Sequence, residues 1–219
     1  QKQIAQLLKA GKRLDGRGLT EYRPIKIETG IIEKAEGSAQ VCLGKTQVMV
    51  GVKIETGEPF ADRPNDGVLT VNSEFVPLAS PEFEAGPPGE ESIELARIVD
   101  RGLRESKAIE LEKLCIAPQK KVFVIFFDVY VLNHDGNLID ASGLAALAAL
   151  LNTKIFKYEI EGVEVVRKPG FTSLPIRNYP VAVTFANIDG KLVVDPWLDE
   201  EQVMDSRLTM AFDKDGNIC

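Results

Sequence analysis

The sequence has little of what metal- and cofactor-dependent enzymes need. Its 219 residues include one histidine and three cysteines. The histidine, His134, cannot form a histidine metal site by itself and lies in a turn sequence, which favours a polar turn residue over a catalyst. Cys42, Cys115 and Cys219 lack metal-ligand spacing, and their odd number is typical of free thiols in a reducing compartment. We therefore expect no metal site and no cofactor.

Long apolar runs are also missing. The longest, residues 143–151, is far shorter than the roughly 20 residues needed to cross a bilayer. The N-terminus shows no basic region followed by an apolar stretch and a cleavage site. The composition, 44% hydrophobic and 27% charged, is that of a globular protein with a real core. We expect a cytoplasmic protein without a membrane partner.

Basic residues are outnumbered by acidic ones. The chain has 26 lysines and arginines against 33 aspartates and glutamates, for a net charge of −7. Proteins that bind nucleic acid on their own usually carry a net positive charge. Any nucleic-acid role therefore requires a local basic patch or a partner that supplies positive charge.

Residues 91–106 are predicted to form one amphipathic helix, with Ser92 as the capping residue. Apolar residues recur along it at near-helical spacing. The expected stripe is Ile93, Ile98 and Leu103, widened by Leu95, Ala96 and Val99.

Arg97, Arg101 and Arg104 follow the i, i+4, i+7 spacing that places side chains on one side of this helix. Such a row can bind phosphates, because each guanidinium can hold two oxygens. The alternative is a set of ordinary surface ion pairs, which spacing alone favours. Those pairs would be made with Glu94, Asp100 and Glu105.

The rest of the chain alternates predicted strands with a few helices. Further helices are expected at 2–10 and 138–152, the second apolar nearly all round and so packed on more than one side. Loops are expected at 13–23, with Arg13 and Arg17 unpaired, and at 80–91. Strands are predicted at 24–28, 38–43, 46–54, 68–78, 121–132, 164–168, 180–188, 191–194 and 207–213, with tight turns at 44–45 and 189–190.

A cluster of carboxylates follows the predicted strand at 191–194. Oxygen ligands of this kind can hold Mg²⁺, but an acid-rich helix start explains them equally well and is the interpretation we favour from the residues alone. The cluster consists of Asp195, Asp199, Glu200, Glu201 and Asp205.

Four segments together resemble the RNase PH family of phosphate-dependent exoribonucleases. Residues 13–53 resemble the family's opening. Residues 94–111, 128–153 and 192–205 are similar to one branch, the non-catalytic RNase PH-type subunit of the archaeal exosome ring. The resemblance implies an α/β protein of the α+β kind, one RNase PH-like domain over 1–219 with helices packed between mixed sheets. The family's further C-terminal strand and helix are expected to be absent.

The resemblance also indicates which functional parts remain. The arginine-rich loop of active members corresponds here to residues 80–91, which are acidic. Their phosphate-binding Gly-Ser/Thr-Arg triplet corresponds to 137–139, Asn-Leu-Ile, whose two apolar side chains cannot neutralise a phosphate. Asp199 and Asp205 match the spacing of an aspartate pair that active members keep. We expect a vestigial acidic pair, no catalytic residues and no activity of the chain alone.

The same resemblance implies partners. It implies pairing with a catalytic RNase PH-type subunit, three such pairs closing a ring around a channel for single-stranded RNA, and RNA-binding cap subunits. In that setting Arg97, Arg101 and Arg104 are expected to bind RNA beside the partner's active site and to help structure it. Two alternatives remain: a phosphorolytic ribonuclease active on its own, and a pure scaffold without RNA contact.

Overall fold

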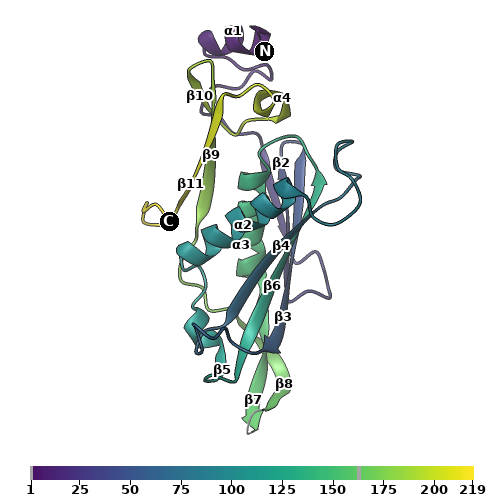
Figure 1. Ribbon diagram of the computed structural model, residues 1–219, viewed down its shortest axis with the longest axis vertical. Helices are drawn as coiled ribbons and strands as arrows, with labels where there is room; N and C mark the ends of the chain where they lie inside the picture. The colour runs from purple at the N-terminus through teal and green to yellow at the C-terminus, as the bar shows by residue number, and fades with distance from the viewer. Residues whose placement is uncertain (1, 162–163) are drawn as a thin grey trace.

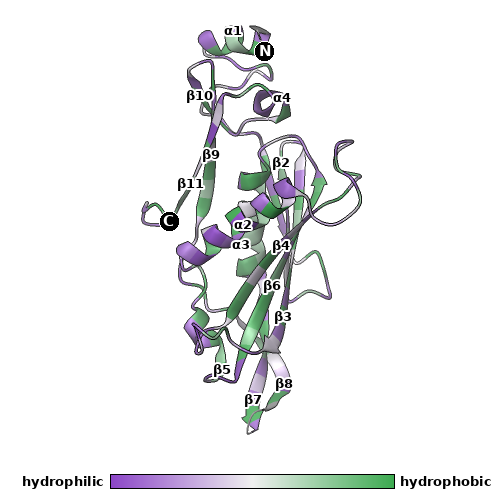
Figure 2. Cartoon of the chain, viewed as in Figure 1, coloured by the Kyte–Doolittle hydropathy of each residue, from purple (hydrophilic) through white to green (hydrophobic). Residues whose placement is uncertain are grey.

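The computed structural model describes residues 2–161 and 164–219 (Figure 1). Two helices lie against a large sheet, a small sheet runs beside them, and a two-stranded hairpin projects at one end. Apolar residues are concentrated in the central strands and in the helix behind them (Figure 2). In the part of the chain that is described, no helix is long and apolar enough to cross a membrane.

The large sheet is built around β6, a run of β-branched and aromatic residues that favours a strand. Neighbouring strands are antiparallel except β4, which runs parallel to β6. The order is β1 (Ile25–Thr29), β2 (Gly37–Leu43), β3 (Thr46–Gly57), β6 (Lys121–Asn133) and β4 (Val68–Phe75), with the short β5 (Cys115–Ala117) also on β6.

The C-terminal third forms two smaller sheets. The strands β9 (Val181–Ile188) and β10 (Lys191–Val194) form a hairpin, and β11 (Ser206–Phe212) pairs with the other edge of β9. The hairpin turn has positive φ at Asp189 and Gly190, as the sequence predicts for a two-residue turn. β7 (Lys154–Glu161) and β8 (Glu164–Ser173) form the projecting hairpin.

The helices link these sheets. α2 (Glu90–Glu105) packs on β4, and α3 (Leu138–Asn152) packs on β2, β3, β9 and α2, which explains why it is apolar nearly all round. The remaining helices are short: α1 (Lys2–Lys9), η1 (Leu111–Leu114) and α4 (Leu198–Glu201). The predicted mixed α and β architecture is confirmed, and the predicted bounds of α3 match the observed ones.

Several local predictions were wrong. Ser92 is not the cap of α2, because the helix begins after Gly89 and Ser92 is buried against β4. Ile93 is 49% exposed, so the packed stripe of α2 is Ser92, Leu95, Val99 and Leu103. The alternation in β1 buries neither Ile25 nor Ile27, since this strand is the edge of the large sheet. β5 and β7 were not predicted.

Candidate nucleic-acid interface

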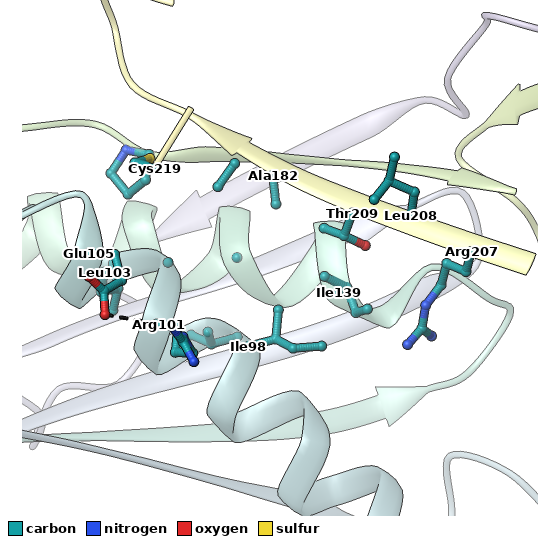
Figure 3. A pocket seen from close by; sticks show the side chains of 15 residues that line it. Ile98, Arg101, Leu103, Glu105, Ile139, Ala182, Arg207, Leu208, Thr209 and Cys219 are labelled. Carbon is teal, nitrogen blue, oxygen red and sulfur yellow. Dashed lines mark ion pairs between the residues drawn. The ribbon is translucent and has the colours of Figure 1, made fainter. Parts of the chain in front are cut away.

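The exposed face of α2 carries the arginine row. Arg97 is exposed and has no carboxylate within 4.0 Å among residues 2–161 and 164–219. The Arg101 side chain is 72% exposed and lies 3.9 Å from Glu105, at the outer limit of an ion pair. Figure 3 shows this contact beside an apolar groove of about 440 Å³ between α2, α3 and β11. Both guanidiniums are therefore available to an external anion.

Arg104 differs from the other two. Its guanidinium donates to both carboxylate oxygens of Asp100, at 3.0 and 2.6 Å, and to the carbonyl oxygen of Leu69 on β4 at 3.0 Å. The predicted ion pair with Asp100 is thus present within α2, and the hydrogen bond to Leu69 ties the helix to the sheet. Glu94, also expected to pair within α2, instead accepts from Arg207 of β11 at 2.8 Å.

Arg13 and Arg17, expected to be unpaired in a loop, are buried in a charged network. Arg13 donates to Glu200 of α4, with its Nε 2.8 Å from Oε1. Arg17 and Arg23 both bind the carboxylate of Asp195, at 2.9 and 2.7 Å. The fully buried charges thus have partners, as buried charges require.

Asp195 is the centre of this network. It lies at the end of β10 and is completely buried. Burial alone would raise the pKa of its carboxyl, but hydrogen bonds from Arg23 and Asn137 outweigh it, so the pKa is lowered. Asp195 and Glu200 therefore serve as structural anions, and they are not free to bind a metal.

The N-terminus of α3 holds an anion from within the chain. Asn137, the N-cap residue, has a left-handed backbone, and its side chain donates to Asp140 and Asp195 at 2.9 and 2.8 Å. Its backbone N–H donates to Oε1 of Glu201 at 2.8 Å. Gly136 permits the close approach of α4 to this helix end, because a Cβ at position 136 would lie 2.5 Å from the Leu198 backbone nitrogen. A carboxylate thus lies where a helix end favours an anion.

A cavity of about 280 Å³ opens in front of this helix end and is strongly acidic. Burial raises the pKa of Glu201 to about 7, partly offset by the Asn137 hydrogen bond and by Arg207. His134 lies on the wall, stacked on Phe83 at 5.5 Å between ring centroids, and burial lowers its pKa. The charged residues lining the cavity are Glu82, Glu91, Glu94, Glu201 and Arg207.

The structure does not bring the expected acidic pair into this cavity. Asp199 is exposed on α4, and neither it nor Asp205 is among the described residues that line the cavity. Asp205 accepts the backbone N–H of Asp189 at 2.8 Å and so stabilises the β9–β10 turn region. The acid that reaches the cavity is Glu201, which the sequence pattern grouped with the helix start but did not distinguish from its neighbours.

The chain matches two family models. Residues 21–155 match domain 1 of the 3′ exoribonuclease family RNase PH, and residues 178–219 match domain 2. It is 59% identical over 217 residues to the exosome complex component Rrp42 of Thermococcus gammatolerans, covering 98% of this chain and 80% of that protein. The Rrp42 of Methanopyrus kandleri is 49% identical over 218 residues, covering 99% and 82%.

The chain is also similar to solved structures of archaeal exosomes. A chain of the Archaeoglobus fulgidus exosome with RNA bound to the active site superposes with a TM-score of 0.90 at 49% identity, covering 99% of this chain and 83% of that one. A chain of an archaeal exosome core superposes with a TM-score of 0.86 at 46% identity, covering 99% and 81%.

Proposed function

Because the chain belongs to the RNase PH family of 3′ exoribonucleases, we propose that it is a ring subunit of an archaeal exosome that binds RNA but does not itself catalyse phosphorolysis. The observation that carries the proposal is a division of charge. The cavity at the N-terminus of α3 is acidic, whereas the exposed face of α2 presents Arg97 and Arg101 to solvent. The first surface repels phosphate and the second attracts it.

The acidic cavity supports catalytic inactivity. A phosphorolytic enzyme must bind inorganic phosphate and RNA, and positive groups are needed to hold both. Here four glutamates face one arginine, Arg207, whose guanidinium already pairs with Glu94 at 2.8 Å. The helix end that could hold a phosphate already donates the Asn137 N–H to the carboxylate of Glu201. We therefore assign no catalytic residue to this chain.

The arginine row supports RNA binding. Arg97 and Arg101 project from the face of α2 opposite its packed stripe, and neither has a close ion pair within the described chain. Contacts of this kind bind the RNA backbone without reading its sequence. Arg104 belongs to the same row, but an RNA contact there must compete with its bidentate pair to Asp100. We rank it third among the three.

The proposed partners are a catalytic RNase PH-type subunit and RNA-binding cap subunits. Three copies of this chain and three of the catalytic subunit would form the ring. Large apolar side chains stay exposed on the described chain, among them Phe171, Leu192 and Leu208, as expected of an obligate subunit. We further propose that residues 1–219 act as one unit, because α3 packs on both the large sheet and β9. The three free cysteines are consistent with a cytoplasmic location.

The test is RNA binding and decay by the complex reconstituted with a catalytic RNase PH-type partner. Replacing Arg97 and Arg101 of this chain with alanine should weaken RNA binding about equally for every sequence. The slope of log affinity against log salt should fall by about 0.7 for each phosphate of the single strand that is no longer bound. The matched control is Lys34→Ala with Lys45→Ala, two exposed lysines away from α2.

Two results would contradict this function. If the arginine variant has the same RNA affinity and salt slope as the parent, the chain is a scaffold and its arginines stabilise the helix or a subunit contact. Phosphate-dependent RNA decay by this chain in the absence of the partner would show that the acidic cavity supports catalysis after all.

A further inference from the structure

A second basic surface lies at the C-terminal end of α2, where the helix meets η1 and the 61–69 segment. Four basic residues line a cavity of about 290 Å³ there: Arg63, Arg104, Lys107 and Arg177. The carboxylates on the same walls are Asp66, Glu105 and Glu112. Two further carboxylates pair with these cations from outside the lining, Asp100 with Arg104 and Glu110 with Arg177, so any attraction for an anion depends on the two remaining cations.

Two of these cations are already engaged. Arg104 is held by Asp100, and the Arg177 guanidinium pairs with Glu112. Arg63 and Lys107 are exposed, and neither has a carboxylate within 4.0 Å in the described ranges 2–161 and 164–219. These two side chains are therefore the groups available to a ligand.

Lys107 has an unusual backbone for a lysine. Its φ is +51°, in the left-handed region that favours glycine. The position ends α2, with the Lys107 N–H bonded to the Arg104 carbonyl and the Ala108 N–H to the Leu103 carbonyl at 3.1 and 3.0 Å. Glycine is the usual residue at such a helix end. Replacing Lys107 with glycine therefore removes the side chain and suits this backbone conformation.

The pocket continues the arginine row. Arg97, Arg101 and Arg104 follow i, i+4, i+7, and Lys107 comes three residues after Arg104, just past the last residue of α2, Glu105. We propose that Arg63 and Lys107 form a second phosphate subsite, which holds the backbone of single-stranded RNA beyond the nucleotides bound at Arg97 and Arg101. The proposal rests on the RNA-binding function proposed above.

The test uses the reconstituted complex carrying Arg63→Ala and Lys107→Gly in this chain. For RNA long enough to pass the end of α2, affinity should fall, and the salt slope should drop by about 1.4, or about 0.7 for each of the two phosphates released. For an oligonucleotide that reaches only Arg97 and Arg101, affinity and slope should equal those of the parent. Lys34→Ala is the control for removal of a surface lysine.

Lys107→Gly also separates a ligand role from a structural one. Glycine relaxes the left-handed backbone, so the melting temperature of this single variant should not fall even as long-RNA affinity does. A lower melting temperature together with unchanged RNA affinity would mean that Lys107 serves the fold, and would overturn the subsite.

The remaining outcomes distinguish this proposal from the one it rests on. If the Arg97 and Arg101 variant loses affinity while the Arg63 and Lys107 variant binds long RNA normally, the subsite is wrong and the RNA-binding function stands. If neither loses affinity, both are wrong. Loss of ring assembly by the folded variant would assign the pocket to a protein partner. Inorganic phosphate that stabilises the parent but not the variant, with RNA affinity equal in both, would assign it to free phosphate.

Discussion

Glu201 lies at a site where a negative charge is unfavourable. Its carboxylate accepts the backbone N–H of Asn137, but burial disfavours ionisation. Arg23 and Arg207 lower its pKa and Asp195 raises it, and burial is the largest cause of the net rise to about 7. The folded protein therefore binds a proton at Glu201 more tightly than the unfolded chain does.

This proton makes stability depend on pH. With a folded pKa of about 7 against an ordinary value of 4.5, the stabilisation is complete below about pH 4.5 and is lost as the pH rises through 7. We predict that Glu201→Gln, which keeps an acceptor for the Asn137 N–H, removes this loss. At pH 8 the variant should be more stable than the parent by up to about 3.5 kcal/mol, at about 1.4 kcal/mol per pKa unit.

The measurement is denaturant unfolding of parent and variant from pH 5 to pH 8. The control is Glu58→Gln, which removes an exposed carboxylate outside the cavity. The free energy of unfolding of this control should change between pH 5 and pH 8 by the same amount as that of the parent. A stability gap between Glu201→Gln and the parent that stays constant over this range would show that Glu201 is ionised throughout.

The two faces of α2 have different roles. Its packed face meets β4 through Leu95, Val99 and Leu103 and through a pair of serines, since the Ser73 hydroxyl donates to the Ser92 carbonyl and the Ser92 hydroxyl to the Ser73 carbonyl, each at 2.6 Å. Its outer face carries the arginines and the half-exposed Ile93. An amphipathic helix that is anchored in this way can present charges without contributing them to the core.

This division predicts unequal costs for two apolar truncations on α2. Leu95→Ala should destabilise the protein by about 2–5 kcal/mol, because Leu95 is 3% exposed and its truncation leaves a cavity. Ile93→Ala should cost less than about 0.5 kcal/mol, as at most surface positions. Chemical denaturation of both variants measures the difference. Equal losses of stability in the two variants would show that Ile93 belongs to the packed face, as the sequence predicted.

Across the whole molecule, buried ion pairs join segments that lie far apart in the chain. The loop that holds Arg13, Arg17 and Arg23 binds Asp195 and Glu200, more than 170 residues away. These contacts fix the N-terminal loop to the small sheet and to α4. Asp195 also accepts from Asn137, so the same network reaches the start of α3.

The position of the acidic pair leads to a prediction for the assembled complex. Asp199 is exposed and Asp205 supports a turn, and neither lines the acidic cavity within the described chain. Replacing both with alanine in this subunit should leave phosphate-dependent RNA decay by the complex close to the parent rate. A decay assay measures this, with sedimentation as the control for ring assembly. Loss of turnover by an intact ring would mean that this subunit has a working site.

Much of the fold could be predicted from local patterns. The bounds of α3, the central position of β6 and the Asp189-Gly190 turn all follow from apolar periodicity, β-branched content and turn chemistry, which act between residues close in sequence. The exposure of the edge strand β1 could not be predicted in this way, because alternation cannot show whether a second layer covers the strand.

The sequence by itself determined most of the helices and strands, the family resemblance and the spacing of the arginine row. Only the tertiary structure decided what each charge does, because an ion pair depends on where distant segments lie. It placed Arg13 against Glu200, 187 residues away, and tied Arg104 to Asp100 and β4 while leaving Arg97 exposed. It also placed Glu201, and not the other four acids of the cluster, at the N-terminus of α3. Spacing could not distinguish these charges, since burial and partners are properties of the packed chain.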